Sequence, residues 1–424
     1  MTLNPLLYGF YQFLKLIVRL ALRIFYPYKI YIHPERLRFD YPAILVSNHP
    51  NTLVDPLTVA AKAQKLVFFL ANAGLFKSGF GHWFFNTFYC IPVQRPQDKG
   101  GKKNISNEDS FSRANEHLAG GGVLYIAPEG TSEMERRLRP LKTGTARIAL
   151  STEKKNNYEV GVAIIPVGLT YYRPEICGSR MIVNVGAPIF PQRLRESYES
   201  DPIQTVRSLT EELEQQLGNL LINTENEQED ERLRTLETVI QHEKPLSGAK
   251  RFQREMELLQ TMREKNDEEF YTLLDNYRTS LQAARVKDRA VSGRSRSGFS
   301  LGAILALPVY LYGLINNYLA VKIPVWLSRK LDLYRGYNAT VKILTALITI
   351  PLFYWLQSKL VEAYLGDLAG WLYLLSLPVS GILYWRLSRW YRNMELRWRY
   401  RRLASEKREE LQKLRNEIIR NWDQ

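Results

Sequence analysis

The chain has 424 residues, of which 45% are apolar and 12% aromatic, so it is long enough for more than one domain and too apolar to be largely disordered. Its 58 lysines and arginines against 43 aspartates and glutamates give a formal net charge of +15, which suits an anionic membrane or a nucleic acid as partner. Two cysteines, Cys90 and Cys177, exclude a disulfide-stabilised scaffold and a four-cysteine zinc site.

Residues 1–32 form an apolar, aromatic segment that predicts an amphipathic helix. Lys15, Arg19 and Arg23 recur at every fourth position and therefore share one helical face. Such a helix is typical of the membrane interface, with its basic side chains turned toward lipid headgroups. The alternative is an ordinary amphipathic helix that covers the core. A cleaved signal peptide is not expected, because no charge precedes the apolar run and no small-residue cleavage site follows it.

Residues 33–192 alternate short apolar runs with helical stretches. The apolar runs are typical of buried strands and cover residues 43–47, 65–70, 122–127, 162–169 and 181–185. Helices are expected over residues 56–63, 107–118 and 143–151. The pattern predicts an α/β domain, with a mixed sheet flanked by helices.

Residues 193–297 are charged and predicted to be helical, with an acidic loop at 223–232 and a hinge rich in serine, glycine and arginine at 292–298. The role of this region is left open by its sequence.

Three uncharged apolar stretches then predict a helical membrane region over residues 298–385. A spanning helix needs about 20 apolar residues, and about 17 are tolerated. The stretches cover residues 298–321, 343–358 and 368–385. Aromatic residues such as Trp355 and Trp371 are placed to lie at the interfaces.

The charges around these stretches predict the orientation of the membrane region. Residues 322–342 carry five basic and one acidic residue, and the tail 386–424 carries twelve basic and six acidic, whereas 359–367 is net acidic. The positive-inside rule therefore places both basic flanks in the cytosol. If the N-terminal domain is also cytosolic, residues 298–321 are re-entrant or interfacial. The alternative is three plain spans with the tail outside.

A histidine and an aspartate follow the first predicted strand. His49 comes two residues after the strand, and Asp55 lies at the start of the next predicted helix. A carboxylate that binds one imidazole nitrogen fixes the tautomer, so that the other nitrogen can act as a general base near neutral pH. A His–Asp pair by itself is a weak signal, because buried pairs are often structural.

A second block follows the third predicted strand. It contains Glu129, Gly130 and Thr131, a turn that offers backbone N–H groups, a carboxylate and a hydroxyl in one place. Arg139 and Lys142 lie shortly downstream, and such side chains suit phosphate recognition.

Two further blocks complete a pattern. Residues 90–95 are an apolar run that ends in Arg95, and residues 164–168 are a strand broken by Pro166. In this order and spacing, the four blocks resemble the glycerolipid acyltransferase superfamily, which makes lysophosphatidic and phosphatidic acid. The resemblance covers about residues 40–190 and is specific as a set, although each block is weak by itself.

The resemblance implies roles for these residues. His49 would deprotonate an acceptor hydroxyl that attacks an acyl thioester, and Asp55 would orient His49. Arg95 and the turn at 129–131 would hold the phosphate or glycerol of the acceptor. Pro166 would belong to acyl-chain or structural packing.

The chain departs from the family pattern at two positions. Five residues rather than four separate His49 from Asp55, so a bulged turn is needed there. Ser132 stands where the family usually has an arginine, so phosphate binding must come from elsewhere, with Arg139 or Lys142 as candidates. Both departures look like the subgroup of fungal-type glycerol-3-phosphate/dihydroxyacetone-phosphate acyltransferases.

The resulting expectation is a membrane-bound O-acyltransferase with its catalytic domain on the cytoplasmic face. It would transfer a fatty acyl group from acyl-CoA or acyl-carrier protein to glycerol-3-phosphate or dihydroxyacetone phosphate, with no metal and no further cofactor. The nearest alternative is sn-2 acylation of 1-acylglycerol-3-phosphate. The alternative from another class is a non-catalytic lipid-binding membrane protein.

The basic tail raises a third possibility. Arginines from 386 to 402 alternate with tryptophan and tyrosine, a composition that can bind RNA. Because this run directly follows an apolar span, anionic lipid headgroups are the favoured partner, and no nucleic acid is expected.

Overall fold

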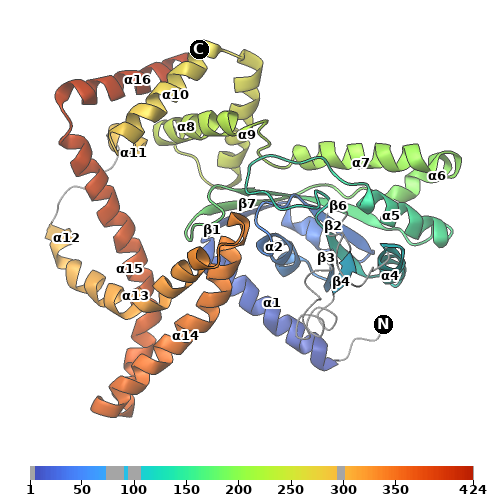
Figure 1. The fold of residues 1–424 in the computed structure, drawn as a ribbon, viewed down its shortest axis with the longest axis horizontal. Coiled ribbons are helices and arrows are strands. Elements are labelled where there is room, and N and C mark those ends of the chain that lie inside the picture. The colour runs from blue at the N-terminus through green and yellow to red at the C-terminus, as the bar shows by residue number, and fades with distance from the viewer. Residues whose placement is uncertain (1–4, 73–89, 94–106, 294–300, 424) are drawn as a thin grey trace. The chain divides into compact units, whose positions relative to one another are not determined.

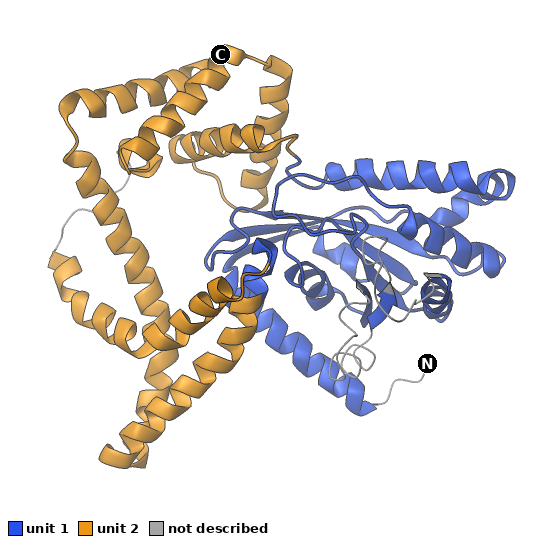
Figure 2. Cartoon of the chain, viewed as in Figure 1, with its two compact units in different colours: residues 1–223, 334–340 blue, residues 224–333, 341–424 orange. Residues whose placement is uncertain are grey.

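The computed structural model describes residues 5–72, 90–93, 107–293 and 301–423, and it divides the chain into two compact units. Unit 1 contains residues 1–223 together with the short segment 334–340 (Figure 2). Unit 2 contains residues 224–333 and 341–424. Arg95 and most of the predicted hinge lie outside the described residues.

A seven-stranded sheet forms the centre of unit 1 (Figure 1). Its order is β1-β7-β6-β2-β5-β3-β4. The strands are β1 (Tyr28–Ile32), β2 (Ala43–Ser47), β3 (Val67–Asn72), β4 (Cys90–Val93), β5 (Val123–Ile126), β6 (Ala163–Tyr171) and β7 (Arg180–Val185). The run from β6 to β4 is parallel, whereas β7 is antiparallel to β6 and β1 is parallel to β7. The predicted α/β fold with a mixed sheet is confirmed.

Helices cover both faces of the sheet. One face packs against α4 (Asn107–Ala119), α5 (Gly144–Lys155) and α7 (Pro202–Gly218), and the other carries α2 (Val54–Lys62) with α1 (Pro5–Phe25) packed on it. Leu124 and Ile164 are fully buried in the first of these layers. Burying a side chain of this size stabilises the fold by about 1.5–3 kcal/mol. Short connecting elements are Pro34–Leu37, Pro191–Leu194, α6 (Arg195–Ser200) and Arg335–Tyr337.

The N-terminal helix is shorter than predicted. It ends at Phe25, and Tyr28–Ile32 form the edge strand β1 instead of continuing the helix to residue 32. Pro27 explains the break, because proline has no backbone N–H and disfavours the helical conformation of the residue before it.

Lys15 on the basic face of α1 is buried, whereas Arg19 and Arg23 are exposed. The Lys15 ammonium donates to the carbonyl of Ala63 at 2.5 Å, and Arg19 Nε donates to the carbonyl of Ala61 at 2.7 Å. These carbonyls lie at the end of α2, where helix carbonyls lack intrahelical donors and the helix dipole is negative. The exposed stripe of α1 is apolar and consists of Leu6, Phe10, Phe13, Leu16, Leu20 and Ile24.

Unit 1 extends beyond the predicted domain boundary at residue 192. Helix α7 begins at Pro202 behind the Asp201 side chain, which accepts hydrogen bonds from the backbone N–H groups of residues 203 and 204. Leu209 and Leu213, one turn apart on α7, are buried against the sheet. Residues 193–223 therefore belong with the sheet, and not with the charged helical region.

Unit 2 contains a group of packed helices. They are α8 (Glu227–Glu243), α9 (Gly248–Lys265), α10 (Glu268–Ala283), α11 (Asp288–Val291) and α16 (Ser405–Asp423). The predicted acidic loop at 223–232 is largely the start of α8, because Asn226 caps it and its acidic first turn favours the positive end of the helix dipole. In the interior of the group, Arg415 of α16 binds Asp288 and Glu243 at 3.0 and 3.1 Å.

The predicted basic tail is therefore not a free tail. Its first part continues α15 (Asp367–Arg401), and its last part is α16, which packs on α8 and α10. The Arg389 guanidinium lies 4.8 Å from the ring centre of Trp385, and that of Arg402 lies 4.0 Å from the ring centre of Trp398. The interleaved arginines and aromatic residues thus stack on one another along the helix.

Among the described residues, four helical stretches are long and apolar enough to cross a membrane: Pro5–Phe25, Leu301–Lys330, Arg335–Leu365 and Asp367–Arg401. The second contains α12 (Leu301–Leu305) and α13 (Leu307–Lys330), and the third contains α14 (Asn338–Leu365). Helices α14 and α15 are longer than the predicted spans at 343–358 and 368–385, because polar turns extend both.

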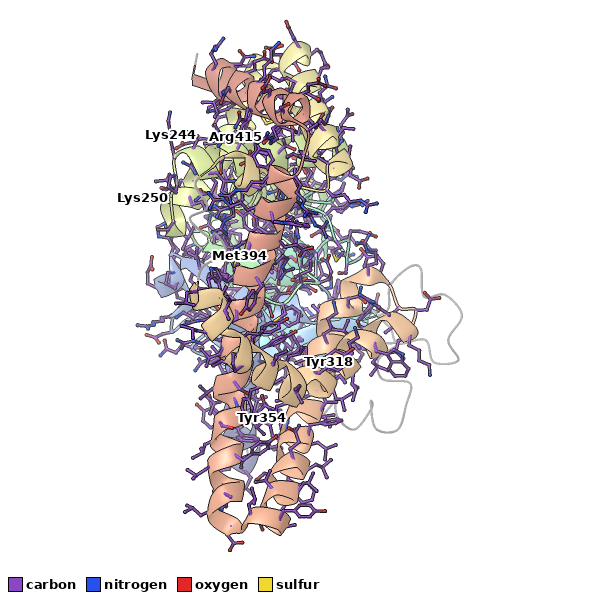
Figure 3. The ribbon with its side chains drawn as sticks, turned by 90° about the vertical axis from the view of Figure 1, so that its left-hand side faces the viewer. Lys244, Lys250, Tyr318, Tyr354, Met394 and Arg415 are labelled. Atoms are coloured by element: carbon purple, nitrogen blue, oxygen red, sulfur yellow. The ribbon has the colours of Figure 1, made fainter. Side chains whose placement is uncertain are left out.

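Helices α14 and α15 run antiparallel (Figure 3). A sharp turn at Gly366, whose φ is +84°, joins them, and Ser358 of α14 donates to the carbonyl of Gly370 of α15 at 2.9 Å. Tyr354 of α14 lies close to α13, where its hydroxyl donates to Asn317 Oδ1 at 2.5 Å.

The stretch 301–330 descends along α15 and then returns along α14. The Ala303 carbonyl accepts from Tyr391, near the C-terminal end of α15, whereas Tyr312 bonds to Ser376 near the N-terminal end. Beyond this point, the carbonyl of Ala320 accepts from Thr349, which lies back toward the start of α14. Ala320 therefore lies closer to the Tyr391 end of the α14–α15 pair than Tyr312 does.

Candidate active site

The site lies at the carboxyl edge of the parallel strands. Because β2, β5 and β6 are parallel neighbours, the residues that follow them meet at one edge of the sheet. His49 follows β2, Glu129 follows β5, and Tyr171 is the last residue of β6. This edge is where ligands bind in open α/β sheets.

His49 and Asp55 form a hydrogen-bonded pair. The distance from His49 Nδ1 to Asp55 Oδ2 is 3.0 Å. Asp55 lies in the first turn of α2 and is fully buried, whereas the His49 side chain is 13% exposed. The N–H at Nδ1 donates to the carboxylate, so Nε2 is the nitrogen that can take up a proton.

Two further donors fix the carboxylate. The backbone N–H of Asn51 donates to Asp55 Oδ2 at 2.7 Å, and the Tyr171 hydroxyl donates to Oδ1 at 2.7 Å. Asn51 in turn donates from its side chain to the Tyr26 hydroxyl at 2.7 Å. With both oxygens occupied, Asp55 can hold the His49 ring in one orientation.

The extra residue between His49 and Asp55 is taken up at Thr52. Its φ of +41° is left-handed, a conformation that β-branched residues rarely adopt. The backbone N–H of Thr52 donates to Ser132 Oγ at 3.1 Å. Such a conformation costs about 1–3 kcal/mol and persists only where the surroundings enforce it.

Glu129 binds the backbone of the loop that carries His49. Its Oε1 accepts from the backbone N–H of His49 at 2.7 Å, and its Oε2 accepts from that of Arg139 at 3.3 Å. Glu129 is 6% exposed, and this burial raises the pKa of its carboxyl group to about 7. The two backbone donors lower the pKa, but by less than burial raises it. Glu129 is therefore placed to hold the protein backbone, where the sequence suggested a contact with the acceptor.

Lys142 lies beside the glycine turn. A Cβ atom added to Gly130 would lie 2.4 Å from Lys142 Nζ, and the φ of Gly130 is +74°, so the lysine occupies the space that glycine leaves. Among the residues described, no carboxylate pairs with Lys142, whereas Arg139 pairs with Glu135 at 3.1 Å. Thr131 follows in the same turn and is half-buried.

Pro166 lies apart from this cluster. It is a buried residue of β6 that pairs with Val46, and its carbonyl accepts from the backbone N–H of Gly186 at 2.8 Å. Its surroundings are those of the sheet interior, so the structural part of its expected role fits its position.

Several residues of the site have no signal in a local motif. Asn48 exchanges two hydrogen bonds with the backbone of Leu169, at 2.9 and 2.8 Å, and so ties β2 to β6. Tyr171 and Tyr26 reach the site from β6 and from the end of α1. Only the strand order, with β6 beside β2, could have pointed to Tyr171.

The described residues offer neither a metal centre nor a covalent nucleophile at His49. They contain no group of three metal-ligating side chains, and no serine or cysteine among them hydrogen-bonds to the histidine. Burial raises the pKa of the Cys90 thiol to about 12, which disfavours the reactive thiolate. An imidazole that is oriented by a carboxylate can act as a general base toward a bound hydroxyl group.

Comparison with known proteins agrees with this class. Residues 29–170 match the family described as Acyltransferase. This segment of the chain is similar to proteins of the glycerolipid acyltransferase superfamily.

The relatives come from two branches. Over 104 residues the chain is 38% identical to "Glycerol-3-phosphate O-acyltransferase 1" of Saccharomyces cerevisiae. This match covers 24% of this chain and 13% of that protein. Over 130 residues it is 28% identical to "1-acyl-sn-glycerol-3-phosphate acyltransferase LPAT1, chloroplastic" of Arabidopsis thaliana, covering 31% of this chain and 32% of that protein. The matches thus span well under half the length of these relatives.

A solved structure is also similar to part of the chain. It is the 1-acyl-sn-glycerophosphate acyltransferase PlsC from Thermotoga maritima, at 19% identity and a TM-score of 0.32, over 46% of this chain and 79% of that one.

Proposed function

We propose that the protein is a membrane-bound O-acyltransferase that transfers a fatty acyl group from a thioester donor to glycerol-3-phosphate or dihydroxyacetone phosphate. The observation that carries this proposal is the His49–Asp55 pair, held by two further donors at the carboxyl edge of a sheet whose segment matches the Acyltransferase family. The donor would be acyl-CoA or acyl-carrier protein, and the reaction needs no metal and no further cofactor.

The chemistry follows from the tautomer of His49. Nε2 removes the proton of the acceptor hydroxyl while that oxygen attacks the thioester carbonyl, and Asp55 stabilises the imidazolium that forms. When the tetrahedral intermediate collapses, the carbon–sulfur bond breaks and the proton passes from His49 to the departing thiolate. The products are an ester and a free thiol, and no acyl group becomes attached to the enzyme.

We assign recognition of the acceptor phosphate to Lys142. Its ammonium lies at the glycine turn of the same sheet edge as His49 and has no carboxylate partner among the described residues. The Arg139 guanidinium is a weaker candidate, because Glu135 already pairs with it. Thr131 offers a hydroxyl in the same turn, and Arg95 remains a candidate from the family pattern.

Membrane attachment places the acyl tail in lipid. The exposed apolar side chains of α1 suit insertion of this helix into one leaflet of the membrane. In our proposal α14 and α15 cross the bilayer, while residues 301–330 enter and return.

Charge assigns the cytosolic side. Residues 322–342 and 386–402 are rich in basic residues, which favour the cytosol and anionic headgroups. The segment 334–340 belongs to the catalytic unit and lies within the first of these flanks, so the catalytic domain would be cytoplasmic.

The matching test is acyl transfer by the full-length protein in detergent. Radiolabelled palmitoyl-CoA is offered with glycerol-3-phosphate, dihydroxyacetone phosphate or 1-acylglycerol-3-phosphate, and His49→Ala is the control. We expect a product from one of the first two acceptors that the variant does not form. Product from 1-acylglycerol-3-phosphate alone would identify an sn-2 acyltransferase, the activity in the names of the plant relatives. No product with either donor carrier would favour a non-catalytic lipid-binding protein.

A further inference from the structure

The connection between α13 and α14 lies in the catalytic unit. Residues 334–340 follow the sheet domain by more than a hundred residues of chain, yet they group with residues 1–223. They lie outside residues 29–170, the segment that matches the acyltransferase family. Their hydrogen bonds reach two loops of the domain, the one after β2 that carries His49 and the one after β5 that carries Glu129.

The first contact is with Thr52. Its Oγ1 lies 3.1 Å from the carbonyl oxygen of Gly336 and 3.1 Å from Thr340 Oγ1. A hydroxyl has one proton, so Thr52 donates to the Gly336 carbonyl and accepts from the Thr340 hydroxyl. Thr52 and Thr340 are both buried, so these groups cannot exchange their partners for bulk water at no cost.

Gly336 fits closely into this contact. A Cβ atom added there would lie 2.7 Å from a ring carbon of Tyr334 and 3.2 Å from the methyl carbon of Thr52. The first distance is shorter than real Cβ contacts allow, so a side chain at position 336 would displace the Tyr334 ring and crowd the Thr52 methyl group.

The second contact runs through Tyr334. Its hydroxyl accepts from the backbone N–H of Met134 at 2.8 Å and donates to Glu133 Oε2 at 3.1 Å. The backbone N–H of Glu133 donates to the carbonyl of His49 at 3.2 Å. The segment therefore reaches the block after β5 as well as the loop after β2.

The consequence concerns the geometry of the His–Asp pair. Thr52 directly follows Asn51, whose N–H binds the same Asp55 oxygen as His49. Thr52 is also the residue whose left-handed backbone absorbs the additional position in this loop. The left-handed conformation requires restraint by neighbours, and Ser132, Gly336 and Thr340 provide it.

We propose that residues 334–340 form a clamp that belongs to the active site, with Thr340 and Tyr334 as positioning residues that hold Thr52 and thereby the His49–Asp55 pair. The proposal rests on the proposed acyl-transfer function of that pair. The proposal means that the connection between α13 and α14 contributes to turnover in addition to joining the two helices.

Thr340→Val removes one hydroxyl from the clamp with little change of shape, and Thr340→Ser restores it. The matched control is Thr349→Val on the same helix, whose hydroxyl binds the Ala320 carbonyl instead. We expect kcat of Thr340→Val to fall about tenfold, the order that one lost hydrogen bond supports, with both KM values unchanged. Thr340→Ser and Thr349→Val should turn over like the wild type.

Coupling between the two threonines separates positioning from general loosening. If Thr52 and Thr340 act through one contact, the double variant Thr52→Val/Thr340→Val should lose no more activity than Thr52→Val alone. Losses that simply multiply would overturn the clamp. Equal losses in Thr340→Val and Thr349→Val would also overturn it, because both would then report on packing of the helices.

Hydrogen exchange tests the clamp without any activity. In the full-length protein in detergent, amides of residues 49–55 should exchange faster in Thr340→Val than in the wild type or Thr349→Val, since Asn51 and Thr52 lose restraint. Unchanged exchange there would refute the clamp. If exchange changes as expected but the wild type transfers no acyl group, the clamp stands as structure and the proposed function fails.

Discussion

The backbone N–H of Thr52 donates to Ser132 Oγ at 3.1 Å, so the longer loop after His49 and the serine at the usual arginine position of the acyltransferase pattern are hydrogen-bonded to each other. An arginine at position 132 has no short hydroxyl to offer to a backbone loop that is one residue longer. The two departures are therefore one structural change. Ser132 binds the backbone of the longer loop, and our proposal assigns phosphate recognition to Lys142 instead.

The role of Asp55 can be tested with a substitution of the same shape. Asp55→Asn presents an amide to His49 Nδ1, which favours the wrong tautomer and leaves Nε2 protonated. We expect kcat to fall by at least about 100-fold, as for His49→Ala, because general-base catalysis contributes on this order. Steady-state rates with saturating donor and acceptor measure the loss. Turnover near the wild-type rate in either variant would remove His49 as the base.

Tyr171→Phe is the companion to that measurement. It removes one of the three hydrogen bonds of Asp55 but leaves the charge and the His49 contact in place. Its loss should therefore be smaller than that of Asp55→Asn.

Lys142 and Arg139 give a matched pair for phosphate recognition. Lys142→Ala should raise KM for the phosphorylated acceptor by about tenfold or more, since a hydrogen bond to a charged group is worth about 1.5–3 kcal/mol. KM for the donor should change less. Arg139→Ala should have the smaller effect, because its guanidinium is already paired with Glu135. The reverse order would move phosphate recognition from Lys142 to Arg139.

The strands of the sheet differ in how far the sequence predicts them. The five predicted strands are runs of apolar residues, fully or nearly fully buried in all but β3, and such runs stand out in any window. β1 merges with the apolar helix before it, and Pro27 is the only local sign of a break. β4 has four residues and contains Pro92, which is unusual within a strand.

Some site residues can be predicted from local sequence motifs, whereas others depend on contacts between distant parts of the chain. His49, Asp55 and Glu129 stand in motifs with recognisable spacing. Tyr171 reaches Asp55 only because β6 is the neighbour of β2, and strand order is set by the packing of the whole domain. The contact of Thr340 with Thr52 joins positions 288 residues apart, so no local pattern predicts it.

The burial of Lys15 predicts different results for two basic residues of α1. Lys15→Met leaves the Ala63 carbonyl without its donor in a buried place, which costs about 1–3 kcal/mol. For a unit of this size, that lowers the melting temperature by several degrees. Arg23→Met should change it little, because Arg23 is exposed. Thermal unfolding in detergent compares them, and equal shifts would contradict a stabilising contact at the buried Lys15.

Protease accessibility in sealed membrane vesicles tests the proposed topology. One variant carries a protease site after Gly366, in the turn between α14 and α15, and another carries it at the C-terminus. With two crossings and a returning stretch at 301–330, the C-terminal site should be cut only from the cytosolic side and the site at the turn only from the opposite side. Cleavage of the C-terminal site from the outside would support three spans instead.

Glu129 predicts how stability changes with pH. Its pKa is raised from 4.5 to about 7, because burial disfavours the carboxylate. In the unfolded chain the group loses its proton near its ordinary pKa, while the folded protein still holds it, so the unfolded state binds fewer protons between pH 4.5 and about 7. Stability is therefore fully present below that window and falls as pH rises through it, by about 3 kcal/mol in the limit of independent titration.

Glu129→Gln removes this titration but keeps the shape of the side chain. Because an amide has one acceptor oxygen for two backbone donors, the variant is expected to be less stable by an amount that does not depend on pH. The slopes are therefore compared instead of the absolute values. Between pH 5 and 7.5, the melting temperature of the wild type should fall by roughly 5–10 °C relative to that of the variant. Parallel pH profiles would show that the two backbone N–H donors keep Glu129 charged throughout, despite its burial.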